Sequence, residues 1–265
     1  MRVLVLCALL FSSLTVPARA EEPFAVKIRH EAPLAAAGAA LWLLTEGLKP
    51  RLAPTDCRLC GRNGLDSAVQ DGLLLQNVHP ARRLSDALLF GLVPGFAFAS
   101  VAGIGLADNK WRSAGENAVV LSEVVVATAL LTQLTKYTVG RERPFLRTQR
   151  DNGLTVTHGP DDNLSFFSGH TSLTFALAVG AGSIASFRDS KHAPWIWGVG
   201  MPLATLTGYL RIAADRHYFT DVLTGALVGS AIGVLVPWLH RHYASDTGPR
   251  VSASPPGMLT MTWLL

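Results

Sequence analysis

The sequence predicts an all-α protein, a membrane-embedded bundle of about five or six long helices with its active site at helix ends on one side. Of the 265 residues, 49% are hydrophobic and only 16% are charged, and the mean hydropathy is +0.30. Soluble domains carry about 25% charged residues, so this composition excludes a disordered chain and an ordinary cytosolic enzyme. The formal charge of +4 is too small and too scattered to indicate a nucleic-acid partner.

The N-terminus has the pattern of a secretory signal. Arg2 precedes an apolar run over 3–14, and Ala18-Arg19-Ala20 precedes two glutamates. A basic start, a short apolar middle and an A-x-A end predict a signal peptide over residues 1–20. The alternative is an uncleaved membrane anchor, although the run is short against the roughly 20 residues that a span needs.

Residues 21–83 form an N-terminal segment whose role the sequence does not reveal. Its stretch 32–45 is uncharged, and this length fits an interfacial or re-entrant helix better than a span. Cys57 and Cys60 form a C-x-x-C pair, but no second pair completes the four ligands of a zinc site. We expect a structural pair rather than a reactive one, and a disulfide if the loop faces an oxidising compartment.

Five later segments have the length of a bilayer span. They run from 17 to 21 residues, against about 20 needed, and small residues recur in them, which permits close approach of helices. A soluble all-α enzyme with buried helices is the alternative. We assign 84–243 to a helical-bundle domain and 244–265 to a C-terminal tail. The segments are 87–107, 117–134, 169–187, 194–210 and 222–239.

The orientation of the bundle depends on the stretch 32–45. A cleaved signal leaves the following chain outside the cell membrane. If 32–45 does not cross, the loop after Lys136 is then periplasmic or extracellular, and if it crosses, that loop is cytoplasmic. The distribution of Lys and Arg does not decide between these arrangements.

Two polar clusters flank the long loop between the second and third of the five segments. Lys136 and Arg143 are seven positions apart and share a face if the helix continues between them, until Pro144 stops it. Ser168-Gly169-His170 opens the next segment. A helix start of this kind presents backbone N–H groups and a hydroxyl to an anion.

A third polar cluster lies between the fourth and fifth segments. His217 and Asp221 are four positions apart, so on a helix the carboxylate can orient the imidazole, and Arg211 precedes them. Taken alone, each cluster also fits a purely structural role: charges that snorkel to the membrane edge, a helix cap, or residues of a solvated loop. Together at helix ends on one side of a bundle, they would form a phosphate site with acid–base groups.

The three clusters resemble the signatures of the type 2 phosphatidic acid phosphatase family, which also includes class A acid phosphatases and vanadium haloperoxidases. Those signatures are Lys-x6-Arg-Pro, Pro-Ser-Gly-His and Ser-Arg-x5-His-x3-Asp. Order and spacing match here, whereas Phe167 replaces the proline and Leu210 the first serine. The resemblance covers about residues 117–240 and leaves 21–83 unexplained.

The resemblance implies a catalytic role for three residues. His217 would be the nucleophile that forms a phosphohistidine, and Asp221 would hold its tautomer and stabilise positive charge on the ring. His170 would act first as the acid for the leaving oxygen and then as the base for water. No metal or cofactor is expected. Phosphate-binding roles fall on Lys136, Arg143, Ser168, Gly169 and Arg211.

Other titratable residues near these signatures have a weaker claim to a functional role. Arg141 is not part of the signature, and we expect it to be a solvated charge. His158 and Asp161-Asp162 lie in the long loop and are candidates for substrate contact, although most loop residues make none.

A site at the ends of membrane helices implies a lipid phosphate or an isoprenyl pyrophosphate as substrate. We expect a bacterial envelope protein in the inner membrane, with its site facing the periplasm. The alternatives are a soluble periplasmic acid phosphatase of broad specificity, a vanadium haloperoxidase and a membrane protein that only binds lipid phosphate.

Overall fold

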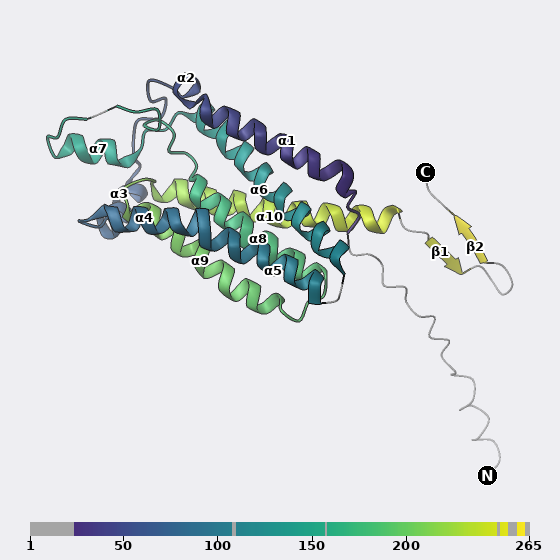
Figure 1. The fold of residues 1–265 in the computed structure, drawn as a ribbon. Coiled ribbons are helices and arrows are strands. Elements are labelled where there is room, and N and C mark those ends of the chain that lie inside the picture. The colour runs from purple at the N-terminus through teal and green to yellow at the C-terminus, as the bar shows by residue number, and fades with distance from the viewer. Residues whose placement is uncertain (1–23, 108–109, 157, 248–249, 254–258, 263–265) are drawn as a thin grey trace, which may run out of the picture.

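The computed structural model describes residues 24–107, 110–156, 158–247, 250–253 and 259–262. Long helices lie side by side along most of its length (Figure 1). The signal peptide predicted at 1–20 and much of the tail predicted at 244–265 lie outside the described residues.

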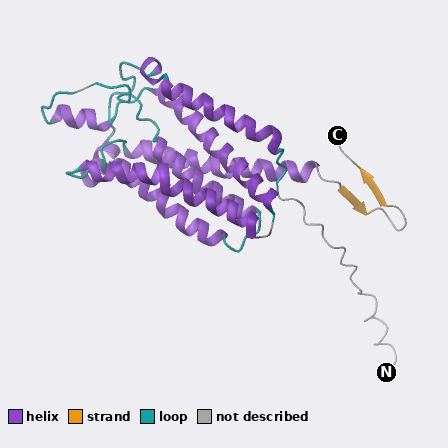
Figure 2. Ribbon diagram, viewed as in Figure 1, coloured by secondary structure: helices purple, strands orange, loops and turns teal. Residues whose placement is uncertain are grey.

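The described chain is helical apart from one short pair of antiparallel strands after the bundle, which confirms the predicted all-α class. The longer loops gather at the end of the bundle where α2, α3 and α7 lie (Figure 2). The elements are α1 (Ile28–Gly47), α2 (Lys49–Leu52), α3 (Gly64–Leu73), α4 (Val78–Ala87), the π-helical turn η1 (Leu88–Leu92), α5 (Val93–Ala107), α6 (Trp111–Val139), α7 (Pro144–Asp151), α8 (Gly169–Phe187), α9 (Ala193–Ala213), α10 (Phe219–Thr247), β1 (Arg250–Ala253) and β2 (Leu259–Thr262).

Within the part of the chain that the structure describes, three helical stretches are long and apolar enough to cross a membrane: Val78–Ala107, Trp111–Val139 and Phe219–His242. At most 39% of the apolar window of each is buried inside the protein, so large apolar faces point outward. Phe90 and Leu227, for example, are 72% and 63% exposed. Exposed apolar area of this extent is unusual for a soluble monomer and is what a lipid-facing surface requires.

Helix α8 lies at the centre of the bundle and packs against α5, α6, α9 and α10. Small residues allow this close packing. A Cβ atom at Gly229 of α10 would meet the backbone oxygen of Ser172, and one at Gly182 would meet the ring of Trp197. Close helix approach of this kind is typical of membrane bundles.

Helix α1 runs beside α6 from one end of the bundle to the other (Figure 1). Near its end, Gln133 of α6 donates to Glu46 at 3.0 Å, and the Tyr137 hydroxyl donates to the Thr45 carbonyl at 2.8 Å. The apolar stretch 32–45 is therefore part of a helix of 20 residues, longer than the uncharged stretch alone. It is not among the three stretches that qualify as membrane spans.

Candidate active site

The three polar clusters meet at the loop-rich end of the bundle. Lys136 lies in the last turn of α6 and His170 in the first turn of α8. Arg211 is in the last turn of α9, and Asp221 is in the first turn of α10. Alternating helix directions bring these ends together, as the sequence indicates.

A cavity of about 600 Å³ opens at this end, between α1, α4, α5, α6, α8 and α9. Six of the eight predicted site residues line it, namely Lys136, Arg143, Gly169, His170, Arg211 and His217. Ser168 and Asp221 are fully buried behind this lining. The Ser168 hydroxyl caps α8 by accepting from the Thr171 N–H and hydroxyl, at 3.4 and 2.9 Å.

His217 lies in the turn between α9 and α10 and is 2% exposed. Its Nε2 is 3.2 Å from Nη1 of Arg143, which places a cation beside this ring nitrogen. Burial, and then the charges of Arg143 and Arg211, hold the pKa of His217 well below its usual value. The ring is therefore neutral near pH 7, as a nucleophile must be.

Asp221 is close to His217 without bonding it. Its Oδ2 is 3.6 Å from Nδ1 of His217, beyond hydrogen-bonding distance, and this Nδ1 has no hydrogen-bond partner within the described residues. Asp221 instead accepts from the Ser165 hydroxyl at 2.5 Å, the Tyr218 N–H at 3.0 Å and Arg141 at 2.5 Å. A small movement of either side chain would complete the expected pair.

Arg143 is held by backbone oxygens rather than by a helix shared with Lys136. Helix α6 ends at Val139 because Gly140 adopts a left-handed conformation, with φ +59°. Arg143 then donates through Nε to the Asp161 carbonyl at 2.8 Å and through Nη1 to the Arg216 carbonyl at 3.1 Å. The loop fold, not a continuous helix face, brings Arg143 into the cavity.

His170 has a carboxylate partner that the sequence did not reveal. Its Nε2 is 2.7 Å from Oδ1 of Asp86 on α4, and the same oxygen is 3.4 Å from Nη1 of Arg211. The ring of Phe90, in the π-helical turn that follows, meets the imidazole edge-to-face at 5.7 Å. The one available signal was the position of Asp86, the last charge before the uncharged run 87–107.

The expectation that Arg141 is a solvated charge is wrong. Its side chain is only 4% exposed, and it bonds the carboxylates of Asp66 at 2.7 Å and Asp221 at 2.5 Å. Two buried carboxylates hold this guanidinium away from water, and neither contact is visible in the local sequence.

Of the loop residues, Asp161 lines the cavity, and its carboxylate is 3.2 Å from Nζ of Lys49. Burial alone would raise the pKa of Asp161, but the charges of Arg143 and Lys49 outweigh burial and lower it. The His158 side chain is 79% exposed and pairs with Asp162 at 3.1 Å, outside the cavity lining.

Part of the cavity lining is apolar. The walls there come from α1, η1, α5, α6 and α8. A second cavity of about 370 Å³ between α1, α5 and α6 shares Phe98 and Val125 with it. The apolar lining of the main cavity consists of Trp42, Leu89, Phe90, Pro94, Phe98, Val125, Ala129, Leu164, Leu173 and Leu177.

A group of three side chains with metal-binding atoms occurs at the opposite end of the bundle. Glu31, Glu123 and His240 have ligand atoms within 4.8 Å of one another. Nε2 of His240 is already 2.6 Å from Oε2 of Glu123, a distance that fits a hydrogen-bonded pair joining α6 to α10.

Residues 117–245 match the family model described as PAP2 superfamily. These residues form a PAP2 superfamily domain. The match includes all three signature clusters and thus all eight predicted site residues.

Curated relatives of the chain are named as phosphatases of lipids. The chain is 31% identical over 150 residues to the lipid A 1-phosphatase of Porphyromonas gingivalis, covering 56% of this chain and 29% of that protein. It is 30% identical over 110 residues to the undecaprenyl-diphosphatase of Sulfolobus acidocaldarius, covering 42% and 48%. The chain thus matches less than half the length of either relative.

Among solved structures, the chain is similar to a transmembrane PAP2-type phosphatidylglycerolphosphate phosphatase from Bacillus subtilis. The identity is 18%, the TM-score is 0.48, and the match covers 80% of this chain and 97% of that one.

Several site residues lie outside the PAP2 domain. Lys49, Arg82 and Asp86 line the cavity, and Asp66 binds Arg141 behind it. Through Lys49 and Arg82, the N-terminal segment 21–83, whose role the sequence left open, therefore contributes to the wall of the cavity.

Proposed function

We propose that this protein hydrolyses a lipid phosphate or an isoprenyl diphosphate through a phosphohistidine at His217. One observation carries the proposal: a single cavity joins a buried neutral imidazole and a ring of cations to an apolar compartment. The polar end suits a phosphoryl group, and the apolar end suits the hydrocarbon next to it. The names of the relatives support the same substrate class.

In the first step, Nε2 of His217 attacks phosphorus and the bond from phosphorus to the leaving oxygen breaks. Arg143, placed 3.2 Å from this nitrogen, stabilises the charge on the phosphoryl oxygens together with Lys136 and Arg211. His170 enters the step as an imidazolium, gives one proton to the leaving oxygen and becomes neutral. Because Asp86 engages Nε2 of His170, the proton passes through Nδ1.

In the second step, water attacks the phosphohistidine, and the bond between phosphorus and Nε2 breaks. His170 takes the proton of the water, inorganic phosphate leaves, and His217 is neutral again. Asp221, close to Nδ1 of His217, stabilises the positive charge that the ring carries while it holds the phosphoryl group.

The charge of the cavity favours a diphosphate over a monophosphate. Its lining contains six basic side chains and three carboxylates, a formal excess of three positive charges. A phosphomonoester brings about two negative charges, and a diphosphate ester brings about three. The cations are Lys49, Arg82, Lys136, Arg143, Arg211 and Arg216, and the carboxylates are Glu46, Asp86 and Asp161.

The test is phosphate release by the detergent-solubilised protein, with EDTA present and no metal added. We expect release from a long-chain isoprenyl diphosphate and from phosphatidic acid, the diphosphate being faster. Both should exceed p-nitrophenyl phosphate in kcat/KM by at least about tenfold, equivalent to about two buried methylene groups. Preference for the water-soluble ester would favour a broad acid phosphatase, and no release would refute the proposal.

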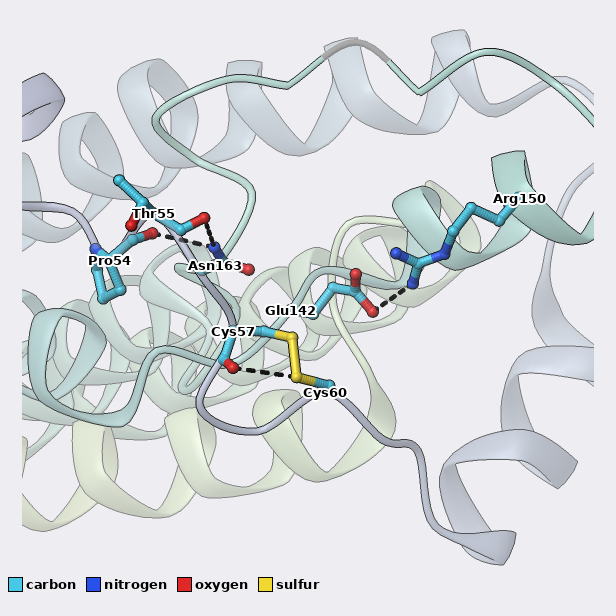
Figure 3. The surroundings of a disulfide bond; sticks show 7 residues. All are labelled: Pro54, Thr55, Cys57, Cys60, Glu142, Arg150 and Asn163. Carbon is cyan, nitrogen blue, oxygen red and sulfur yellow. Dashed lines mark hydrogen bonds and ion pairs between the residues drawn. A yellow bond between two sulfur atoms is a disulfide. The ribbon is translucent and has the colours of Figure 1, made fainter.

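We also propose that the protein lies in a bacterial inner membrane with its site facing the periplasm. The disulfide between Cys57 and Cys60 supports this orientation (Figure 3). It lies at the site end of the bundle, because Arg58 and Leu59 between the two cysteines donate to the Gly140 carbonyl, and disulfides persist in oxidising compartments.

A membrane-crossing α1 would make this orientation incompatible with a cleaved signal. The chain enters α1 near the far end of the bundle, where the Ala25 N–H donates to the His240 carbonyl at 3.1 Å. If α1 crosses the membrane and the site is periplasmic, residue 25 lies in the cytoplasm. Residues 1–20 would then remain attached to the protein. We therefore keep the periplasmic orientation and propose that the signal is not cleaved.

Labelling can test this orientation. After treatment with a membrane-impermeant phosphine, Cys57 and Cys60 should react with an impermeant maleimide in intact spheroplasts. The Cys7→Ser substitution ensures that the maleimide can label only Cys57 and Cys60. Labelling only after lysis would place the site in the cytoplasm. The mass of the purified intact protein, measured by mass spectrometry, would then show whether residues 1–20 are absent.

A further inference from the structure

A segment before the PAP2 domain, 54–73, packs directly against the signature loops. The backbone N–H groups of Arg58 and Leu59 donate to the Gly140 carbonyl at 2.9 and 3.4 Å, and the Glu142 N–H donates back to Leu59 at 3.1 Å. Asn163 donates to the Pro54 and Thr55 carbonyls, both at 3.0 Å (Figure 3). Residues 54–59, which include Cys57, are thus hydrogen-bonded to the loops that carry Arg143 and Ser168.

Asp66 on α3 is the most buried charge of this segment, with no exposed surface. Its Oδ1 accepts from the backbone N–H of Thr220 at 2.9 Å, and its Oδ2 accepts from the Thr220 hydroxyl at 2.9 Å. Thr220 lies in the first turn of α10, between His217 and Asp221. Asp66 therefore fixes the N-terminus of the helix that carries Asp221.

Arg141 connects Asp66 to Asp221. Nη2 donates to Asp66 at 2.7 Å, and Nη1 donates to Asp221 at 2.5 Å and to the Thr220 hydroxyl at 2.8 Å. The guanidinium also lies over the ring of Tyr218, 4.3 Å from its centroid. The carboxylates of Asp66 and Asp221 thus share one buried cation. Removing either carboxylate leaves Arg141 paired with the other one alone.

We infer that Asp66, acting through Arg141, positions Asp221 and His217 for the proposed phosphoryl transfer. Asp221 can serve His217 only by closing the 3.6 Å gap between Oδ2 and Nδ1, and Arg141 holds its other oxygen. Without the charge of Asp66, Arg141 would bind Asp221 alone and draw it away from the imidazole. This inference rests on the proposed function, and it gives the N-terminal segment a positioning role.

The test is Asp66→Asn, which keeps the size of the side chain and removes its charge. We expect kcat for a lipid phosphate to fall by about 10- to 100-fold, because small misplacements of catalytic groups cost this much. KM and inhibition by inorganic phosphate should stay within about twofold, since the cavity lining is untouched. Asp71→Asn is the matched control on the same helix, where the carboxylate is 71% exposed, and it should keep wild-type kcat.

A double-variant cycle separates this role from a general loss of stability. If Asp66 acts through Arg141, the variant with Asp66→Asn and Arg141→Gln should have the kcat of Arg141→Gln alone. Thr220→Val, which removes only the bridging hydroxyl, should lower kcat while the protein stays folded, and it replaces Asp66→Asn if that variant does not fold.

Three outcomes would count against these conclusions, in distinguishable ways. A normal kcat in Asp66→Asn, or in Thr220→Val where Asp66→Asn does not fold, would overturn the positioning role while leaving the proposed function intact. Fully additive losses in the cycle would show that Asp66 does not act through Arg141. Absence of turnover by the wild-type protein would overturn the proposed function, and this inference with it.

Discussion

Replacing His217 by alanine should lower phosphate release by at least about 10³-fold, because loss of a nucleophile removes the covalent route. The imidazole is buried between α9 and α10 and makes few bonds, with Nδ1 unpartnered among the described residues. The substitution should therefore leave the fold intact. The measurement is kcat with an isoprenyl diphosphate, together with the melting temperature in detergent.

His158→Ala is the matched control for this variant. His158 is a loop imidazole near the site whose side chain is 79% exposed, and it does not line the cavity. Its replacement should leave kcat unchanged. Substantial activity in folded His217→Ala would contradict the role of His217.

Replacing Arg143 by lysine should lower kcat by about 10²- to 10³-fold, the usual effect of removing one donor from a transition-state site. The guanidinium binds the Asp161 and Arg216 carbonyls and still reaches His217. Lysine keeps the charge but cannot reproduce this forked geometry. The kcat of this variant with the same diphosphate measures the effect.

The matched control is Arg147→Lys on α7. The Arg147 side chain is 41% exposed and pairs only loosely with Asp151, at 3.7 Å. It should keep wild-type activity. Equal kcat in the two lysine variants would show that the charge of Arg143, and not its fork, is what the reaction needs.

The helices and the signature clusters were predictable because their signals are local. Long apolar runs define the helices, and helix ends are where polar residues must gather in such a bundle. The predicted segments 117–134 and 222–239 lie inside α6 and α10. The resemblance to the phosphatase family is confirmed by the PAP2 match over 117–245.

The contacts of individual charges were not predictable, because they depend on packing between distant segments. Arg141 reaches Asp66 across 75 positions and Asp221 across 80. Asp86 reaches His170 across 84 positions. No local pattern marks Asp66, and the position of Asp86 before an uncharged run does not by itself identify a partner for His170.

Backbone geometry explains a further difference. Lys136 and Arg143 reach one cavity although Gly140 ends the helix between them, so their spacing does not reflect a shared helix face. Ser168, expected to bind phosphate, uses its hydroxyl to cap α8. Its phosphate-binding role stays a prediction.

The central claim is a covalent phosphoryl group on His217, and trapping that group tests it most directly. Wild-type protein would be mixed briefly with an isoprenyl diphosphate radiolabelled in its terminal phosphate, quenched in alkaline detergent and digested. We predict a label that is stable in alkali, lost in acid, located on the peptide with His217 and absent in His217→Ala. Turnover with no label on the protein, or with a label on another residue, would contradict this mechanism.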